Sequence, residues 1–230
     1  MMMSNHKLTL EEEFLKYHEG LQDELNKAYT HYEICKYIRG LKKDYLAELN
    51  EASTFFGLTI NAHLFATVMS INKFIDKTSE SLKMDVFFRF IEDNLNLFSH
   101  EAFENRLRSK GNYDEHWVRN HIAITSDMVR EDKERLGKLP INNLKEWRNK
   151  KLAHIDKKYV LRNADVMQES PVKIQEIDDI INTLHEILNR YLVAYDGTQW
   201  DIGLAPTKYQ IKYIVDAIRF YRESRDIKKV

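Results

Sequence analysis

A chain of 230 residues with 43% hydrophobic and 31% charged residues has the composition of an ordinary globular protein, which excludes an intrinsically disordered chain. Its single cysteine, Cys35, excludes an intramolecular disulfide and a cysteine-rich zinc site. The net charge of −1 means that any binding of nucleic acid must rest on a local basic patch. We find no signal-peptide core and no apolar run near the roughly 20 residues of a membrane span, so we expect a cytoplasmic protein without membrane contact.

Helices joined by short turns are predicted along the chain, because it has only 3 prolines and 7 glycines. The first helix begins at a capping box, Thr9-x-x-Glu12, and Gly40 is expected to end or bend it. A second helix, from about 51 to 77, is apolar on most sides, as a central bundle helix would be. His63 within it is expected to have a structural role.

Five further helices follow from apolar residues at helical spacing, over about 84–95, 102–108, 115–136, 172–195 and 207–225. Between them, Pro140 begins a helix whose core-facing residues are predicted to be Ile141, Leu144, Trp147 and Leu152. The predicted fold is an all-α, antiparallel multi-helix bundle that forms one structural domain. Residues 1–200 make the bundle, and a C-terminal helix within 201–230 packs on the bundle or on a partner.

One segment concentrates groups that can hold a phosphate and move a proton. It reads Trp-Arg-Asn-Lys-Lys-Leu-Ala-His-Ile-Asp and runs from Trp147 to Asp156. A solvated helix face would explain Arg148, Lys150 and Lys151 by themselves, but it explains His154 and Asp156 less well. Metal ligands are not clustered anywhere in the sequence, and we see no Gly-rich phosphate loop, so no metal and no cofactor are expected.

The order Arg-Asn, four residues, His, together with the following Ile-Asp, resembles the signature of the HEPN superfamily, in particular its abortive-infection U-type branch. A second resemblance lies upstream, where the segment from Phe55 to Lys77 looks like that family's long second helix ending in a turn with the sequence Lys-Phe-Ile-Asp-Lys, from Lys73 to Lys77. The resemblance implies an all-α bundle and, in active members, a metal-independent ribonuclease. It also implies a supporting structural role near the motif for Asp76. A carboxylate on a solvated turn is the alternative reading of that residue.

Cleavage of RNA without a metal needs a proton-transfer group and a cation that holds the phosphate. His154 can transfer protons at neutral pH, and Arg148 presents a planar fork that matches phosphate oxygens. Asn149 is the third predicted catalytic residue, because its amide can fix a phosphate or the imidazole.

The neighbouring residues are assigned binding and supporting roles. Lys150 and Lys151 are expected to bind RNA phosphates, and Asp156 to orient His154. The predicted function is therefore a metal-independent endoribonuclease that cuts RNA by attack of the 2′-hydroxyl, leaving a 2′,3′-cyclic phosphate. The resemblance to the HEPN superfamily implies that it serves in phage defence or in a toxin–antitoxin system.

A second copy of the chain is the expected partner besides RNA. Arg148 and His154 are six positions apart, which on a straight helix splays the two side chains by roughly 120°. The superfamily's solution is a homodimer in which two motifs meet across a two-fold axis. An antitoxin or a defence-system protein is a further expected partner. The alternative function is a catalytically silent HEPN module that binds RNA, a nucleotide or a partner protein.

Overall fold

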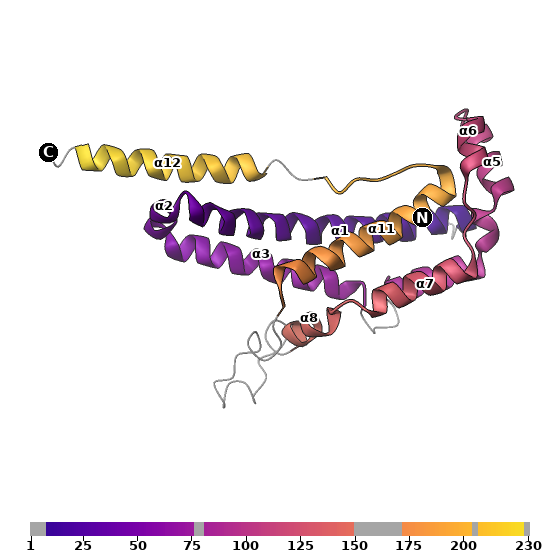
Figure 1. The fold of residues 1–230 in the computed structure, drawn as a ribbon, viewed down its shortest axis with the longest axis horizontal. Coiled ribbons are helices and arrows are strands. Elements are labelled where there is room, and N and C mark those ends of the chain that lie inside the picture. The colour runs from indigo at the N-terminus through magenta and orange to yellow at the C-terminus, as the bar shows by residue number, and fades with distance from the viewer. Residues whose placement is uncertain (1–7, 76–80, 150–171, 204–206, 228–230) are drawn as a thin grey trace, which may run out of the picture. The chain divides into compact units, whose positions relative to one another are not determined.

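The computed structural model describes residues 8–75, 81–149, 172–203 and 207–227. Within these ranges all regular structure is helical and no strand occurs, which confirms the predicted all-α class. Figure 1 shows these elements along the chain. Asp76, Lys150, Lys151, His154 and Asp156, which were singled out from the sequence, lie outside the described ranges.

The first long helix, α1, runs from Leu10 to Gly40, as predicted. The Glu12 carboxylate accepts from the backbone N–H of Thr9 at 2.8 Å, and the Thr9 hydroxyl accepts from the N–H of Glu12 at 3.2 Å. These two bonds form the predicted capping box. Cys35 lies buried on the apolar face of α1, and burial raises the pKa of its thiol. Cys35 is therefore a buried apolar residue, not a reactive one.

A turn reverses the chain after α1. It consists of a short 3₁₀ helix, η1 (Leu41–Lys43), and α2 (Leu46–Glu51), and it leads into α3 (Ser53–Lys73). The break at Ala52 has φ −126° and ψ 42°, outside the helical region, so α3 begins two residues later than the sequence indicated.

The middle of the chain folds into shorter helices. After α4 (Met84–Asp93) and η2 (Leu95–Phe98), the hydroxyl of Ser99 accepts from the backbone N–H of Ala102 and begins α5 (His100–Ser109).

The single helix predicted over 115–136 is wrong, because the chain breaks in its middle. It forms α6 (Glu115–Asn120) and α7 (Ser126–Gly137), joined by an extended segment. His121 leaves the helical region with ψ 133°, and the Thr125 hydroxyl caps α7 by accepting from the N–H of Met128 at 3.3 Å. The break leaves Trp117 at the surface of α6. This residue is one of the apolar residues at helical spacing over 115–136, and it is 49% exposed.

Three helices complete the described chain. These are α8 (Ile141–Trp147), α11 (Ile174–Asp196) and α12 (Thr207–Ile227). Gly197 ends α11 with φ 78°, a conformation that favours glycine, and a Cβ there would lie 3.2 Å from the Trp117 ring. On α11, His185 bonds through Nε2 to the carbonyl oxygen of Trp200 at 2.8 Å, which ties the segment after Gly197 back to the helix.

The chain divides into two compact units. Unit 1 comprises residues 1–25 and 71–201, and unit 2 comprises residues 26–70 and 202–230. The helices α1 and α3 each contribute residues to both units, so the units are not consecutive domains. The expectation of one structural domain with a C-terminal extension stays a prediction.

An aromatic cluster fills the core of unit 1. Phe14 from α1 meets Phe98 edge-on, with ring centroids 5.1 Å apart, and Tyr191 from α11 meets Phe87 edge-on at 5.5 Å. All four side chains are fully buried. Edge-to-face pairs of this kind stabilise a core beyond the area that they bury.

A buried arginine joins the parts of unit 1. The Arg106 side chain, 5% exposed, donates to the carbonyl oxygens of Leu97, at 2.6 Å, and Tyr195. It also pairs with Glu11 at 3.0 Å, and its guanidinium lies 3.8 Å from the centre of the Tyr195 ring. The buried Arg106 guanidinium thus connects η2 and the end of α11, through two carbonyl oxygens, with the start of α1, through the half-exposed Glu11 carboxylate.

Unit 2 holds α12 against the turn between α1 and α3. Its core consists of Ile38, Leu41, Leu49, Phe56, Ile211 and Val215. At the edge of this core the Glu48 carboxylate, which is almost fully buried, accepts from Arg219 at 3.2 Å and from Arg222 at 2.9 Å. Asp216 of α12 accepts from the Tyr45 hydroxyl at 3.0 Å. The docking of α12 therefore combines apolar burial with charged contacts.

The attachment of α12 should weaken in acid. Burial alone would raise the pKa of Glu48, but a bond from its own backbone N–H and the two arginines outweigh burial and lower it. A lowered carboxyl pKa contributes stability above about pH 4.5, and this contribution is lost as the pH falls below that value. We expect Glu48→Gln to lower the melting temperature at pH 7 and to make progressively less difference toward pH 3. Thermal melts of both proteins across this range test it, and a gap that is constant with pH would contradict it.

The helix α3 is only partly covered by the rest of the chain. By length and composition it could cross a membrane, although no apolar run of that length was expected, and one such helix is weak evidence. Only 33% of its most apolar stretch is buried, and Phe55, Leu58 and Met69 are exposed. The expectation that this helix is apolar on most sides is correct, but the described part of the chain leaves one of its apolar faces exposed.

Candidate active site

The helix α8 positions the first residues of the motif. Pro140 precedes it, and Ile141, Leu144 and Trp147 are buried, as predicted. Spacing of three residues places these side chains on one face of the helix. Leu152, the fourth predicted core residue, lies outside the described ranges. The polar residues of the motif therefore follow directly after a helix whose apolar face is buried in the protein.

A hydrogen bond from α3 holds the last turn of α8. The Asn72 amide, in a side chain only 2% exposed, donates to the carbonyl oxygen of Leu144 at 3.2 Å. The same carbonyl accepts from the backbone N–H of Arg148. The carbonyl oxygen of Leu144 thus accepts two hydrogen bonds, one from α3 and one from the backbone of Arg148. Together they hold the last turn of α8, from which the motif continues.

Arg148 and Asn149 stand at the end of this anchored helix. The backbone of Arg148 is still helical, with φ −54° and ψ −53°, and a wider, π-helical turn begins there. The Arg148 side chain is half-buried and that of Asn149 is exposed. Wider turns of this type are rare and occur frequently at functional sites. An arginine on the last, fixed turn is suited to hold an anion in a defined place.

A family model described as AbiU2, of the HEPN type, matches residues 11–220. The chain belongs to this family. AbiU2 is a HEPN-like abortive-infection family, so the resemblance drawn from the motif is confirmed. No curated protein and no solved structure matches the chain.

Two of the seven predicted site residues of this AbiU2-family chain are described, and they are sequence neighbours. Arg148 and Asn149 follow α8 directly, as the motif required. The other five are Asp76, Lys150, Lys151, His154 and Asp156, which lie outside the described ranges. Their catalytic, RNA-binding and supporting roles stay predictions. Within the described part of the chain, no group of three or more His, Cys, Asp or Glu side chains could hold a metal ion.

His63, which was predicted to have a structural role, contacts a second histidine in unit 2. Its Nδ1 lies 2.9 Å from Nδ1 of His31 on α1, so one ring donates and the other accepts. Burial, and then the neighbouring His31, lower the pKa of His63. The contact between the two rings joins α1 to α3 inside the AbiU2-type bundle, and it involves no residue of the motif.

A cavity of about 770 Å³ in unit 1 was not predicted. Trp117, Ile122 and Val193 contribute to its walls beside His121. The Nε2 of His121 bonds to the carbonyl oxygen of Ala194 at 3.0 Å, while its buried Nδ1 has no hydrogen-bond partner among the described residues. Burial lowers the pKa of His121, so its ring is neutral near pH 7. The cavity arises at the break between α6 and α7, which helical periodicity did not indicate.

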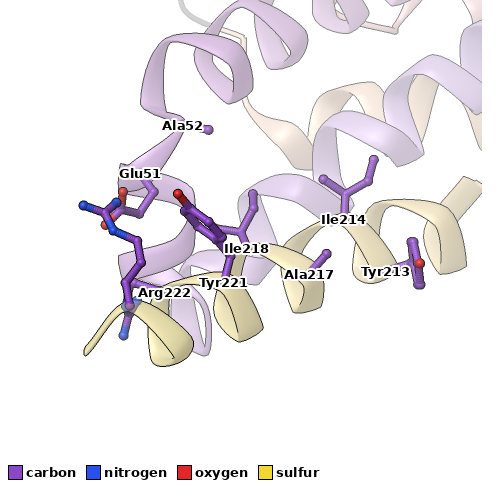
Figure 2. Close-up of a pocket in the computed structure, with 9 residues that line it drawn as sticks. Glu51, Ala52, Tyr213, Ile214, Ala217, Ile218, Tyr221 and Arg222 are labelled. Atoms are coloured by element: carbon purple, nitrogen blue, oxygen red, sulfur yellow. The ribbon is translucent and has the colours of Figure 1, made fainter. Parts of the chain in front are cut away.

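A smaller cavity, about 480 Å³, lies in unit 2 (Figure 2). Glu51 and Ala52, at the junction of α2 and α3, form one side of it, and α12 forms the other. Its residues on α12 are Tyr213, Ile214, Ala217, Ile218, Tyr221, Arg222 and Arg225. Neither Arg148 nor Asn149, the two predicted site residues that the structure describes, is among the lining residues of either cavity.

Proposed function

We propose that this AbiU2-family chain is a metal-independent endoribonuclease that acts in the cytoplasm, in phage defence or as the toxin of a toxin–antitoxin pair. The observation that carries the proposal is the family match over residues 11–220, which spans the whole motif from Arg148 to His154. The fixed end of α8, from which the motif continues, supports it. The expected partners are RNA, a second copy of the chain, and an antitoxin or another protein of the same defence system.

The proposed reaction uses the substrate's own 2′-hydroxyl. Its oxygen forms a bond to phosphorus while the bond from phosphorus to the 5′-oxygen breaks, which gives a 2′,3′-cyclic phosphate and a 5′-hydroxyl. A base takes the proton from the 2′-hydroxyl, and an acid supplies one to the leaving oxygen. His154 is assigned proton transfer and Arg148 the stabilisation of charge on phosphorus, with Asn149 fixing a phosphate or the imidazole.

Basic and acidic neighbours complete the proposed site. Lys150 and Lys151 supply the local positive charge that a chain of net charge −1 needs in order to bind RNA. Asp156 orients the His154 ring, and Asp76 supports the motif. Because Arg148 and His154 are splayed by roughly 120° on a straight helix, two copies of the motif are proposed to meet across the two-fold axis of a homodimer.

Cleavage should not depend on a metal ion, since the 2′-hydroxyl route uses only protein side chains. We expect RNA to be cut at the same rate in excess EDTA and the products to carry 2′,3′-cyclic phosphate ends. Phosphatase and cyclic-phosphodiesterase treatment of the fragments, followed by end-labelling, reads out the ends. Activity that disappears on chelation and returns with Mg²⁺ would overturn this chemistry. Binding of RNA without any cleavage would favour the catalytically silent module instead.

A further inference from the structure

The helix α3 has two apolar faces, and only one of them is covered. One face is buried within unit 2 and includes Phe56, Leu64 and Val68. The opposite face consists of Phe55, Leu58, Ala62, Phe65 and Met69, which we call the α3 seam. In the seam Leu58 is 66% exposed, Phe55 56% and Met69 40%, while Ala62 is exposed and Phe65 is half-buried. Burial of such side chains is worth roughly 1.5–3 kcal/mol each, so leaving them in water is unfavourable.

The spacing of the α3 seam fits a second helix. Its residues are separated by three, four, three and four positions, the repeat that keeps one side of a helix against a partner helix. From Phe55 to Met69 the seam spans about 21 Å at 1.5 Å per residue. An apolar line of this length and repeat is the pattern of a two-helix contact, rather than that of a small-molecule pocket.

The charge of α3 restricts the kind of partner. No residue from Ser53 to Asn72 is charged, and Lys73 at the very end is the only charged residue of the helix. An uncharged face offers nothing to the phosphates of RNA or to an acidic peptide. A helix that lies at a membrane surface would carry lysine and arginine on its polar side, and α3 has no such side. The matching surface must therefore be another uncharged, apolar helix.

A second copy of α3 satisfies all these requirements. It has the same repeat, the same length and the same absence of charge, and a two-fold interface needs a surface that is complementary to itself. We propose that α3 packs against α3 of a second copy through the α3 seam. This inference names the paired helix of the homodimer in the proposed function, but it rests on α3 alone and not on ribonuclease activity.

Exposed apolar side chains are concentrated in unit 2, as expected if a partner covers part of the surface of that unit. Of the 17 large hydrophobic side chains that are exposed among the described residues, nine belong to unit 2, although unit 2 has about a third of the chain. Concentrations of this kind mark interaction surfaces in soluble proteins.

A charge placed in the seam should separate the two copies. We expect the parent to show twice the chain mass of 27.4 kDa by light scattering at micromolar concentration. Leu58→Glu should show the single-chain mass, with a dissociation constant raised by at least about 100-fold, because it buries an unpaired carboxylate. Ile122→Glu is the matched control, since Ile122 is 70% exposed in unit 1, and it should leave the mass unchanged. Thermal melts confirm that each variant is folded.

Cross-linking tests the same contact without weakening it. Ala62 stands in the middle of the α3 seam, so the two copies of this residue meet in either direction of a two-fold pairing. Ala62→Cys should form an intermolecular disulfide under mild oxidation, whereas the buried native Cys35 should not.

Two outcomes would overturn the inference, a monomeric parent and a Leu58→Glu protein that stays dimeric. If the monomeric parent also floats with phosphatidylglycerol vesicles, the partner of the α3 seam is a membrane and not a second copy. Each is read without measuring RNA cleavage. An inactive protein that dimerises through α3 would contradict the proposed ribonuclease activity and leave this inference standing. An active monomer would contradict this inference and the proposed homodimer, and leave the ribonuclease activity standing.

Discussion

Replacing His154 with alanine should abolish RNA cleavage, by at least about 10²-fold, and leave RNA affinity largely intact. Proton transfer by a positioned histidine contributes roughly 10²–10⁴-fold to a rate, whereas the binding of phosphate rests on the cationic residues Arg148, Lys150 and Lys151. Any toxicity during growth should disappear with the activity. The measurement is a gel of cleaved RNA beside a binding titration for the parent and the variant.

The companion substitution, Arg148→Ala, should lower both cleavage and affinity. Loss of one phosphate contact should also reduce the slope of log affinity against log salt by about 1. Arg148→Lys is the matched control: it keeps the charge but loses the planar fork, so it should retain affinity better than cleavage. A silent binding module predicts a different result, in which the parent does not cut RNA and both alanine variants bind more weakly.

Thermal melts separate catalysis from folding for these variants. Substitutions of surface polar side chains typically change stability by only about ±0.5 kcal/mol. We expect all three variants, including the two at the half-buried Arg148, to melt as the parent does. If His154→Ala instead unfolds the protein, His154 is a buried structural residue and its catalytic assignment must be dropped.

Replacing Arg106 with methionine should cause the largest loss of stability, about 3 kcal/mol or more. The carbonyl oxygens of Leu97 and Tyr195 would remain buried without their donor, at a cost of about 1–3 kcal/mol each, and the contact with the Tyr195 ring would also be lost. Because Arg106 joins three segments of unit 1, the change should lower the cooperative melting transition of that unit. Chemical denaturation of both proteins measures the difference.

A neighbour on the same helix provides the control for Arg106. Arg108 is exposed and pairs with Glu104, one turn away, at 2.6 Å. Surface pairs of this type contribute roughly 0–1 kcal/mol, so Arg108→Met should be almost neutral. Equal effects of the two substitutions would show that the buried network around Arg106 does not stabilise unit 1 as described.

Much of the fold could be predicted because its signals are local. The capping box at Thr9, the end of α1 at Gly40 and the start of α8 after Pro140 each depend on residues within one turn. The break between α6 and α7 was missed because its apolar residues kept helical spacing on both sides. Only the capping hydroxyl of Thr125 marked it, and threonine is common inside helices as well.

Contacts between residues that are far apart in the sequence could not be predicted from the sequence alone. Asn72 and Leu144 meet at the end of α8 although 72 residues separate them, and nothing near either residue indicates the other. Periodicity could show that α3 is apolar on most sides, but it could not show which face the chain itself covers. Of the candidate site, the order of residue types in the motif was readable, and the placement of Arg148 and Asn149 after a buried helix agrees with it.

Incubation of the purified protein with total RNA in EDTA tests the central claim most directly. We predict that the parent produces discrete fragments with 2′,3′-cyclic phosphate and 5′-hydroxyl ends, and that the His154→Ala protein, prepared in the same way, produces none. Intact RNA after incubation with a folded, RNA-binding parent would contradict the account, as would equal cleavage by the parent and the variant.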